Sequence, residues 1–203
     1  GLPLEVEDSN YQTLFPESTE GTLFSYNGEQ YLLEEELQMG NGYWLRFDNE
    51  GETELNGLPV NQITIPLLHG WNLFSGISTD VDVDDIIDEE GIIVPNTIYG
   101  FTDFYYLPNF IEVGKGYWVY SSDDGYITLT TDSTQYLSKS ITFNDKTNEG
   151  NSLQFTNNNG HTISLYFGIK LNESKKLSYS LPPKPPAGAF DVRFKGDTRV
   201  TKE

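Results

Sequence analysis

The chain has 203 residues, of which 31 are acidic and 12 are basic, so its formal net charge is −19. It contains no cysteine, which excludes a disulfide, a thiol nucleophile and a thiolate-ligated metal. Aromatic residues make up 14% of the chain, and together with 19 glycines and 10 prolines this composition is typical of β-rich structure with many turns.

The charge is divided unevenly along the chain. Residues 1–130 carry 24 acidic and 2 basic side chains, a net charge of −22, whereas residues 131–203 carry 7 and 10, a net charge of +3. Such asymmetry predicts at least two modules. A strongly acidic segment repels phosphate backbones, so we expect no nucleic-acid partner. No apolar run approaches the roughly 20 residues that a membrane helix needs, so no membrane span is expected.

Residues 1–20 are acidic and weakly patterned, and we expect an N-terminal edge segment with one short strand around Tyr11, Leu14 and Phe15. The first residues, Gly1–Glu5, have neither the basic nor the apolar region of a signal peptide. We therefore interpret the chain as a processed or excised piece of a larger protein.

Two later stretches look like copies of each other. Thr22–Tyr26 is followed by Met39–Leu45, and Thr97–Phe101 is followed by Val113–Val119. The glycines, tyrosine and tryptophan of the second member of each pair match at an offset of 74 residues, and the threonines match at 75. A duplication that keeps its turn glycines and aromatics indicates a repeated packing unit. We predict one repeat over residues 21–61 and a second over 62–130.

Alternating apolar residues and turn signals predict the elements inside the repeats. The Asn27-Gly28 pair is a typical hairpin turn. A short helix is predicted near residues 80–90, where acidic residues would favour the helix N-terminus. The expected strands are Thr22–Tyr26, Gln30–Leu33, Tyr43–Phe47, Gln62–Leu68, Trp71–Ile77 and Tyr126–Leu129.

Residues 131–203 differ from residues 1–130 in net charge and in sequence pattern, and we predict that they form a β-sandwich-like C-terminal domain. Its Pro-rich segment, residues 181–188, cannot lie inside a sheet and should form a stiff extended connection. The overall expectation is an all-β fold of tandem small β-modules with one short helix, followed by this domain. The expected C-terminal strands are Ser140–Phe143, Ser152–Phe155, His161–Tyr166, Lys176–Ser180 and Phe190–Phe194.

Aromatic residues are the first candidates for ligand binding. Adjacent strand residues face opposite sides, so one member of each Tyr-Trp pair must face outward. Large aromatics usually fill β cores, but a flat exposed ring could instead stack on a sugar. Three consecutive aromatics beginning at Phe104 cannot all point inward. The sugar-stacking candidates are Tyr105, Tyr106, Trp118 and Trp44.

An acidic run is the candidate metal site, because calcium prefers carboxylate and carbonyl oxygens. The first three carboxylates match the ligand spacing of an EF-hand loop, but Asp85 stands where glycine is required and Gly91 where glutamate is required. A helix with an acidic first turn explains the same run. No other cofactor is implied. The candidate ligands are Asp80, Asp82, Asp84, Asp85 and Asp88.

Catalytic motifs are not apparent. His69 and His161 fall in different modules, and neither a Gly-x-Ser-x-Gly elbow nor a His-Glu-x-x-His zinc motif occurs. We expect no enzyme, and a glycoside hydrolase is the lowest-ranked alternative. The carboxylates that would serve it are Glu34, Glu35, Glu36 and Glu112.

Three segments together resemble a module repeated in large secreted proteins of Bacteroidetes-type bacteria: Gly70–Leu73, Thr97–Phe101 and Gly114–Val119. Residues 181–194 resemble the stretch that precedes the sorting domain of such proteins. The first repeat departs from the pattern, since no Gly-Trp-Asn-Leu stands upstream of Thr22. The chain also ends at Glu203 without the sorting domain.

The resemblance implies export by the type IX route and an extracellular or cell-surface location. We therefore expect a non-catalytic structural or adhesive module of a larger extracellular protein, whose partners are other domains of that protein or copies of itself. The basic tail could dock on the acidic repeats of a neighbouring chain. The alternative is a carbohydrate-binding accessory module of an exported hydrolase, with a polysaccharide as its ligand.

Overall fold

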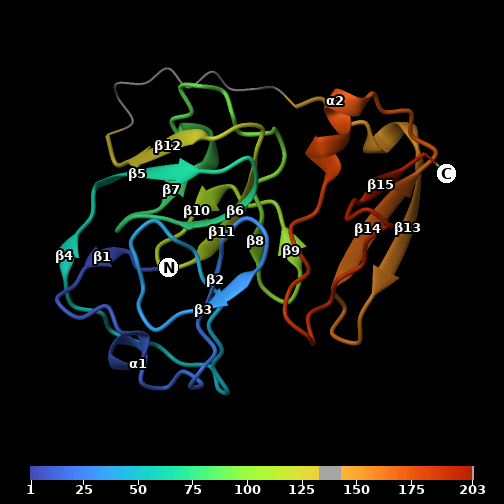
Figure 1. The fold of residues 1–203 in the computed structure, drawn as a ribbon. Helices are drawn as coiled ribbons and strands as arrows, with labels where there is room; N and C mark the ends of the chain where they lie inside the picture. Colours follow the sequence, from blue (N-terminus) through green and yellow to red (C-terminus); the bar gives the residue numbers. More distant parts are fainter. Residues whose placement is uncertain (133–142, 203) are drawn as a thin grey trace.

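Short antiparallel strands dominate the computed structural model, which describes residues 1–132 and 143–202 (Figure 1). The fold is all-β, as predicted. The helical elements are short turns: α1 (Tyr11–Leu14), η1 (Val83–Asp85), η2 (Thr147–Glu149), α2 (Glu173–Lys176) and η3 (Leu177–Tyr179). No helix in the described ranges is long and apolar enough to cross a membrane.

The N-terminal part is built from small antiparallel pairs. β1 pairs with β4, and β2 pairs with β3 around a turn at Gly28, whose φ of 96° favours glycine. Buried Leu2, Tyr11, Leu23 and Leu37 form the core of this part. The strand bounds are β1 (Leu4–Glu5), β2 (Phe24–Tyr26), β3 (Tyr31–Leu33) and β4 (Leu58–Pro59).

Two six-residue ladders enclose the largest core. β5 (Gln62–Leu67) pairs with β12 (Gly125–Thr130), and β6 (Gly70–Ser75) pairs with β11 (Gly116–Ser121). Side chains from all four strands meet between the ladders in one buried cluster. Shorter pairs flank it: β7 (Val81–Asp82) with β10 (Phe110–Ile111), and β8 (Gly100–Phe101) with β9 (Tyr105–Tyr106).

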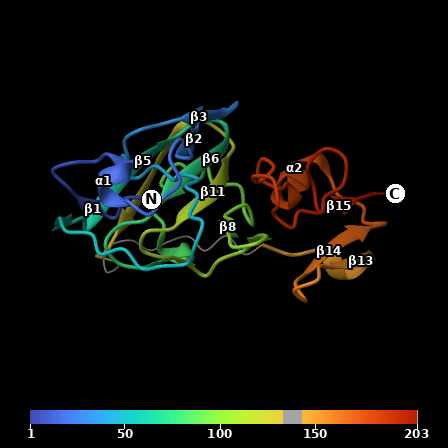
Figure 2. The same ribbon diagram turned by 90° about the horizontal axis from the view of Figure 1, so that it is seen from below.

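The C-terminal part lies beside the repeats, as Figure 2 shows from a second direction. β13 (Asn151–Thr156) pairs antiparallel with β14 (Thr162–Phe167), and β15 (Val200–Thr201) adds to β14 in parallel. The small core here contains Ile169, Tyr179 and Val200.

Several predicted elements differ from the observed ones. The helix predicted near 80–90 is replaced by β7 and the single turn η1, because Ile86 returns to extended backbone after that turn. The strand predicted at Lys176–Ser180 is wrong, since those residues end α2 and form η3. Residues 190–194 form no ladder, and the final strand is β15. The strand predicted at 140–143 falls almost entirely outside the described residues.

The two Tyr-Trp stretches make the same contacts. Trp44 exchanges two backbone hydrogen bonds with Phe24, at 2.8 and 2.9 Å, and Trp118 exchanges two with Tyr99, both at 2.9 Å. A positive φ, 83° at Gly40 and 79° at its counterpart Gly114, shapes the turn before each stretch.

The tyrosine hydroxyls are also equivalent. Tyr43 accepts a hydrogen bond from the backbone N–H of Gln38, and Tyr117 accepts one from that of Glu112, both at 2.9 Å. Each hydroxyl thus ties its Tyr-Trp stretch to the turn five residues earlier, although only Tyr117 lies in a strand, because residues 43–47 form isolated bridges in place of the predicted strand.

The structural similarity also includes residues 1–20, where a capped turn resembles the one at Asp82. The Asn10 side chain accepts from the N–H of Gln12 at 3.0 Å, and the Asp82 side chain accepts from that of Asp84 at 2.9 Å. Buried Tyr11 belongs to a capped helical turn and not to the edge strand that its sequence predicts.

We predict that Tyr117→Phe lowers the free energy of unfolding by about 1–3 kcal/mol, because it leaves the part-buried Glu112 N–H without an acceptor. Tyr43→Phe should cost less, since Tyr43 is only half-buried. Urea denaturation measures both, with the exposed Tyr126→Phe as the control. An equal loss in all three variants would contradict the structural role of the hydroxyls.

A shared aromatic cluster and a candidate binding pocket

Each repeat places an aromatic ring on the tryptophan of the other. The ring of Tyr26 lies 5.0 Å from that of Trp118, and the ring of Phe101 lies 4.8 Å from that of Trp44. Both contacts are edge-to-face, the geometry that aromatic quadrupoles favour. The crossed pairs join the two repeats through side chains that occupy equivalent positions.

The Pro-rich segment lies across this cluster. Tyr105 donates a hydrogen bond to the carbonyl of Pro183 at 2.8 Å, and Tyr31 donates one to that of Lys184 at 3.3 Å. Leu181 packs into the same aromatic cluster. This segment joins no sheet, so its carbonyls have no ladder partners, and the tyrosine hydroxyls donate to two of them.

Burial suppresses ionisation of these tyrosines. It raises the pKa of Tyr31 to about 12, and it also raises the pKa of Tyr105 and of Tyr99. Desolvation of the phenolate is the largest cause in each case. The hydroxyls therefore stay protonated and act as donors at neutral pH.

The four predicted sugar-stacking residues fall into different environments. Trp118 is 1% exposed, so the prediction that its ring is open to a ligand is wrong: the rings of Tyr26, Tyr31 and Trp71 surround it. Half-buried Trp44 packs on Phe101.

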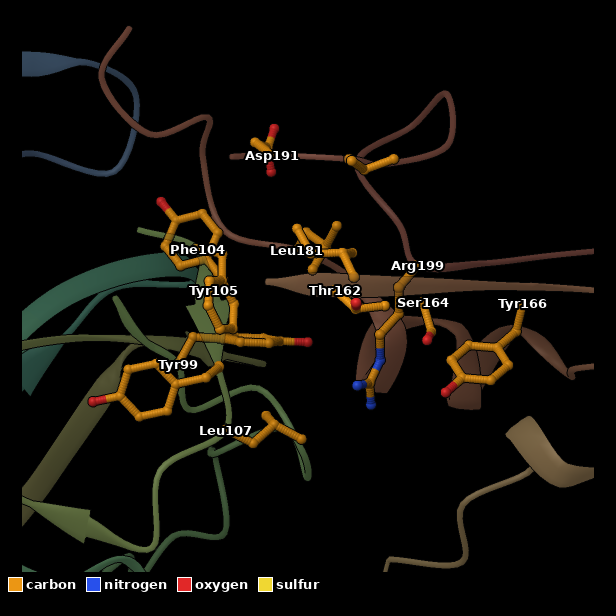
Figure 3. A pocket seen from close by; sticks show the side chains of 13 residues that line it. Tyr99, Phe104, Tyr105, Leu107, Thr162, Ser164, Tyr166, Leu181, Asp191 and Arg199 are labelled. Carbon is orange, nitrogen blue, oxygen red and sulfur yellow. The ribbon is translucent and has the colours of Figure 1, made fainter. Parts of the chain in front are cut away.

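Half-buried Tyr105 and Tyr106 border a pocket of about 290 Å³ between the second repeat and the C-terminal part. Figure 3 shows Tyr99, Phe104 and Tyr105 on one side and Arg199 with Tyr166 on the other. The hydroxyls of Thr162 and Ser164 also belong to its wall.

Arg199 is the unusual group in this pocket. Its Nε and Nη2 atoms are buried and have no hydrogen-bond partner among the described residues, and its guanidinium lies 5.5 Å from the centre of the Tyr179 ring. Asp191, also on the pocket wall, instead binds Arg193 through both carboxylate oxygens, at 2.6 and 2.7 Å. A cation among aromatic rings and hydroxyls can bind the carboxylate or sulfate of a small ligand.

Sequence reasoning missed Arg199, Thr162, Ser164 and Tyr166 as site residues. The residues that line this side of the pocket come from β14 and from the turn before β15. These residues lie opposite Tyr105 only because the C-terminal part docks against the second repeat. No local sequence pattern predicts that docking. The available signal was alternation along the strand predicted at His161–Tyr166, which places Thr162, Ser164 and Tyr166 on one face.

The acidic run is used mostly for backbone capping. Asp80 accepts from the N–H of Val113 at 2.9 Å, and Asp88 accepts from those of Ile92 and Ile93 at 3.0 and 2.8 Å. Asp82 caps η1, whereas Asp84 and Asp85 are exposed. Among the described residues no three carboxylate or histidine side chains converge as metal ligands. Calcium binding stays a prediction without a ligand set.

The candidate catalytic carboxylates take separate local partners. Lys115 donates to Glu112 at 2.5 Å, and Ser25 donates to Glu34 at 2.7 Å. Glu35 and Glu36 are exposed. None of the four lines the pocket.

Comparison of the chain with protein-family models, with curated proteins and with solved structures finds no match.

We predict that the protein loses stability as the pH rises from 10 to about 12. Tyr31 ionises near pH 10 when unfolded but only near pH 12 when folded, so its contribution is complete below pH 10 and is lost through this window. Tyr31→Phe should reduce the slope of unfolding free energy against pH there, as chemical denaturation would measure. Exposed Tyr126→Phe is the matched control, and the same slope in both variants would contradict the assignment.

Proposed function

We propose that this chain is a non-catalytic structural or adhesive module of a larger extracellular or cell-surface protein. The aromatic cluster carries the proposal, because rings that a sugar-binding face would leave open here join the two repeats and the Pro-rich segment. A unit whose parts share one cluster suits a role in which the module keeps its shape within an assembly.

The surface charge supports the same role. Both basic residues of the repeats form exposed local ion pairs: Arg46 lies 3.3 Å from Asp48, and Lys115 bonds to Glu112. With both of these cations counted, residues 1–130 still carry a net charge of −22. The more basic C-terminal part of a neighbouring chain offers the complementary charge, which favours head-to-tail contacts.

The proposal predicts that copies of the chain associate in a salt-dependent way and that the chain catalyses no reaction. Sedimentation should show larger species at low ionic strength (about 0.02 M) and a shift toward monomer at about 0.5 M, because screening weakens exposed charge contacts. Association that ignores salt would contradict the charge-based contact.

A parallel pull-down on insoluble and immobilised polysaccharides, with and without calcium, tests the alternative role. Retention on a neutral glycan that is lost in Tyr106→Ala would overturn the structural proposal. The same experiment separates a calcium effect from direct glycan binding.

A second candidate function is binding of an acidic sugar in the pocket, and the two Arg199 nitrogens that have no hydrogen-bond partner among the described residues favour it. An arginine can bind a carboxylate through two parallel hydrogen bonds while aromatic rings contact the sugar face.

If this candidate is correct, calorimetric titration with a uronic-acid or sulfated oligosaccharide should show binding that weakens at least about tenfold in Arg199→Ala, since one charged hydrogen bond contributes on that order. Arg199→Lys should recover part of the affinity by keeping the charge. Exposed Arg46→Ala is the control. Equal binding by all variants would exclude the pocket as the site.

A further inference from the structure

The two repeats contribute equivalent tyrosines to one site. Tyr31 and Tyr105 are 74 positions apart, the same offset that relates the two Tyr-Trp stretches. In the β2–β3 pair Tyr31 stands opposite Tyr26, and in the β8–β9 pair Tyr105 stands opposite Phe101. Tyr26 and Phe101 are the rings that cross between the repeats. The crossed contacts therefore bring two equivalent hydroxyl groups to the same stretch of chain.

These hydroxyls bind consecutive carbonyls of the Pro-rich segment. Tyr105 donates to the carbonyl of Pro183 at 2.8 Å, and Tyr31 donates to that of Lys184 at 3.3 Å. A proline has no backbone N–H, so a Pro-rich segment presents acceptors more than donors. Aromatic side chains that line a binding surface are a recurring means of recognising such segments.

Two further contacts extend the binding of this segment. Tyr99 donates to the carbonyl of Ser180 at 3.2 Å. Leu181, which is 8% exposed, packs into the same aromatic cluster. We call Tyr31, Tyr99 and Tyr105 the tyrosine site. All three belong to the repeats, so the repeats by themselves carry the groups that bind these carbonyls.

The shape of the bound segment, in contrast, is set within the C-terminal part. Arg193 donates to the carbonyl of Pro182 at 2.7 Å, and Asp191 binds that guanidinium through both carboxylate oxygens. The backbone of Ser180, with φ of −67° and ψ of 147°, is extended in the manner that proline also favours. A segment that is already ordered in this way loses little conformational entropy when it binds.

The C-terminal part adds little to the apolar core of the repeats. It has a buried cluster of its own around Tyr179, and among the described residues Leu181 is its only member of a buried cluster of the repeats. The hydrogen bonds of the tyrosine site, and one from the N–H of Phe190 to the carbonyl of Asp103 at 2.9 Å, supply further contacts. Polar interfaces within one chain allow its parts to move apart. The segment can therefore leave the tyrosine site at the cost of one buried side chain and a few hydrogen bonds.

We propose that the tyrosine site is a receptor for a Pro-rich segment and that residues 180–184 of a second copy occupy it when copies of the chain associate. Such an exchange replaces each contact of the chain's own segment by the same contact between copies, so it requires no new surface. The charges favour it, since residues 131–203 carry +3 and meet residues 1–130 of the neighbour, which carry −22. This inference rests on the proposed module role and specifies the contact through which copies join.

Complementation between two variants tests the exchange on the full chain. The site variant, Tyr31→Phe with Tyr105→Phe, keeps both rings and loses two hydrogen-bond donors. The segment variant, Leu181→Ser with Pro183→Gly, loses a buried side chain and one restricted backbone position. A mixture holds intact sites and intact segments on different chains, so it should form a 1:1 complex whose Kd is at least about tenfold lower than that for self-association of either variant. Sedimentation measures all three samples, and a mixture that behaves as the sum of its components would overturn the exchange.

A peptide tests what the tyrosine site recognises. Residues 180–188, Ser-Leu-Pro-Pro-Lys-Pro-Pro-Ala-Gly, labelled with a fluorophore, should bind the segment variant. Adding Tyr31→Phe and Tyr105→Phe should weaken this binding at least about tenfold, because two hydrogen bonds are lost. Tyr126→Phe, which alters an exposed hydroxyl, is the matched control. If the segment variant does not fold, the unaltered chain replaces it with peptide at about millimolar concentration, since a tethered segment competes at an effective concentration of that order.

The remaining outcomes separate the occupants and the two proposals. A peptide with alanine in place of its four prolines should bind more weakly, because its backbone regains freedom. Equal binding of an all-proline peptide of the same length would overturn the assignment to a second copy, and peptide affinity that ignores the two tyrosine substitutions would overturn the receptor. If each variant associates in a salt-dependent way and mixing adds nothing, this inference is lost and the module role stands, so the two failures are distinguishable.

Discussion

The crossed edge-to-face contacts between the repeats are the constraint on which the rest of the structure depends. Tyr26 reaches Trp118 and Phe101 reaches Trp44, so neither tryptophan is packed by its own repeat alone. The small strand pairs of the N-terminal part would be marginal by themselves, because a two-stranded hairpin buries too little surface. Joining the repeats through four rings gives both a common aromatic core.

The same cluster determines how the C-terminal part attaches. Tyrosines whose rings pack near the tryptophans direct their hydroxyls outward to the carbonyls of residues 180–184. A stiff Pro-rich segment loses little conformational freedom when it is bound in this way. The docking in turn creates the pocket, since Tyr105 contributes both to the Pro183 contact and to the pocket wall. Architecture and candidate binding site therefore depend on one group of side chains.

The all-β class could be predicted from the sequence because alternation and turn glycines are local signals. Strands such as Thr22–Tyr26 and Trp71–Ile77 lie close to β2 and β6. The prediction of a helix near 80–90 was wrong because acidic residues do not indicate a helix alone. Asp82 and Asp88 each accept hydrogen bonds from backbone N–H groups, and such capping occurs both at a helix start and in an extended segment with one turn. Alternation along the strand could not decide between a core and an exposed position for Trp118, because the other repeat supplies two of the rings that cover it. Arg199 was missed since its pocket forms only between parts distant in the chain.

The two repeats have nearly the same sequence motifs but differ in the strands that pack beside them. Both keep the glycine turn and the tyrosine hydroxyl contact, yet within residues 1–132 and 143–202 only the second has a neighbouring strand along its Tyr-Trp stretch. That strand accounts for the complete burial of Tyr117 and for the partial exposure of Tyr43. Within the described residues, the pairing of β6 with β11 is therefore what distinguishes the second repeat from the first.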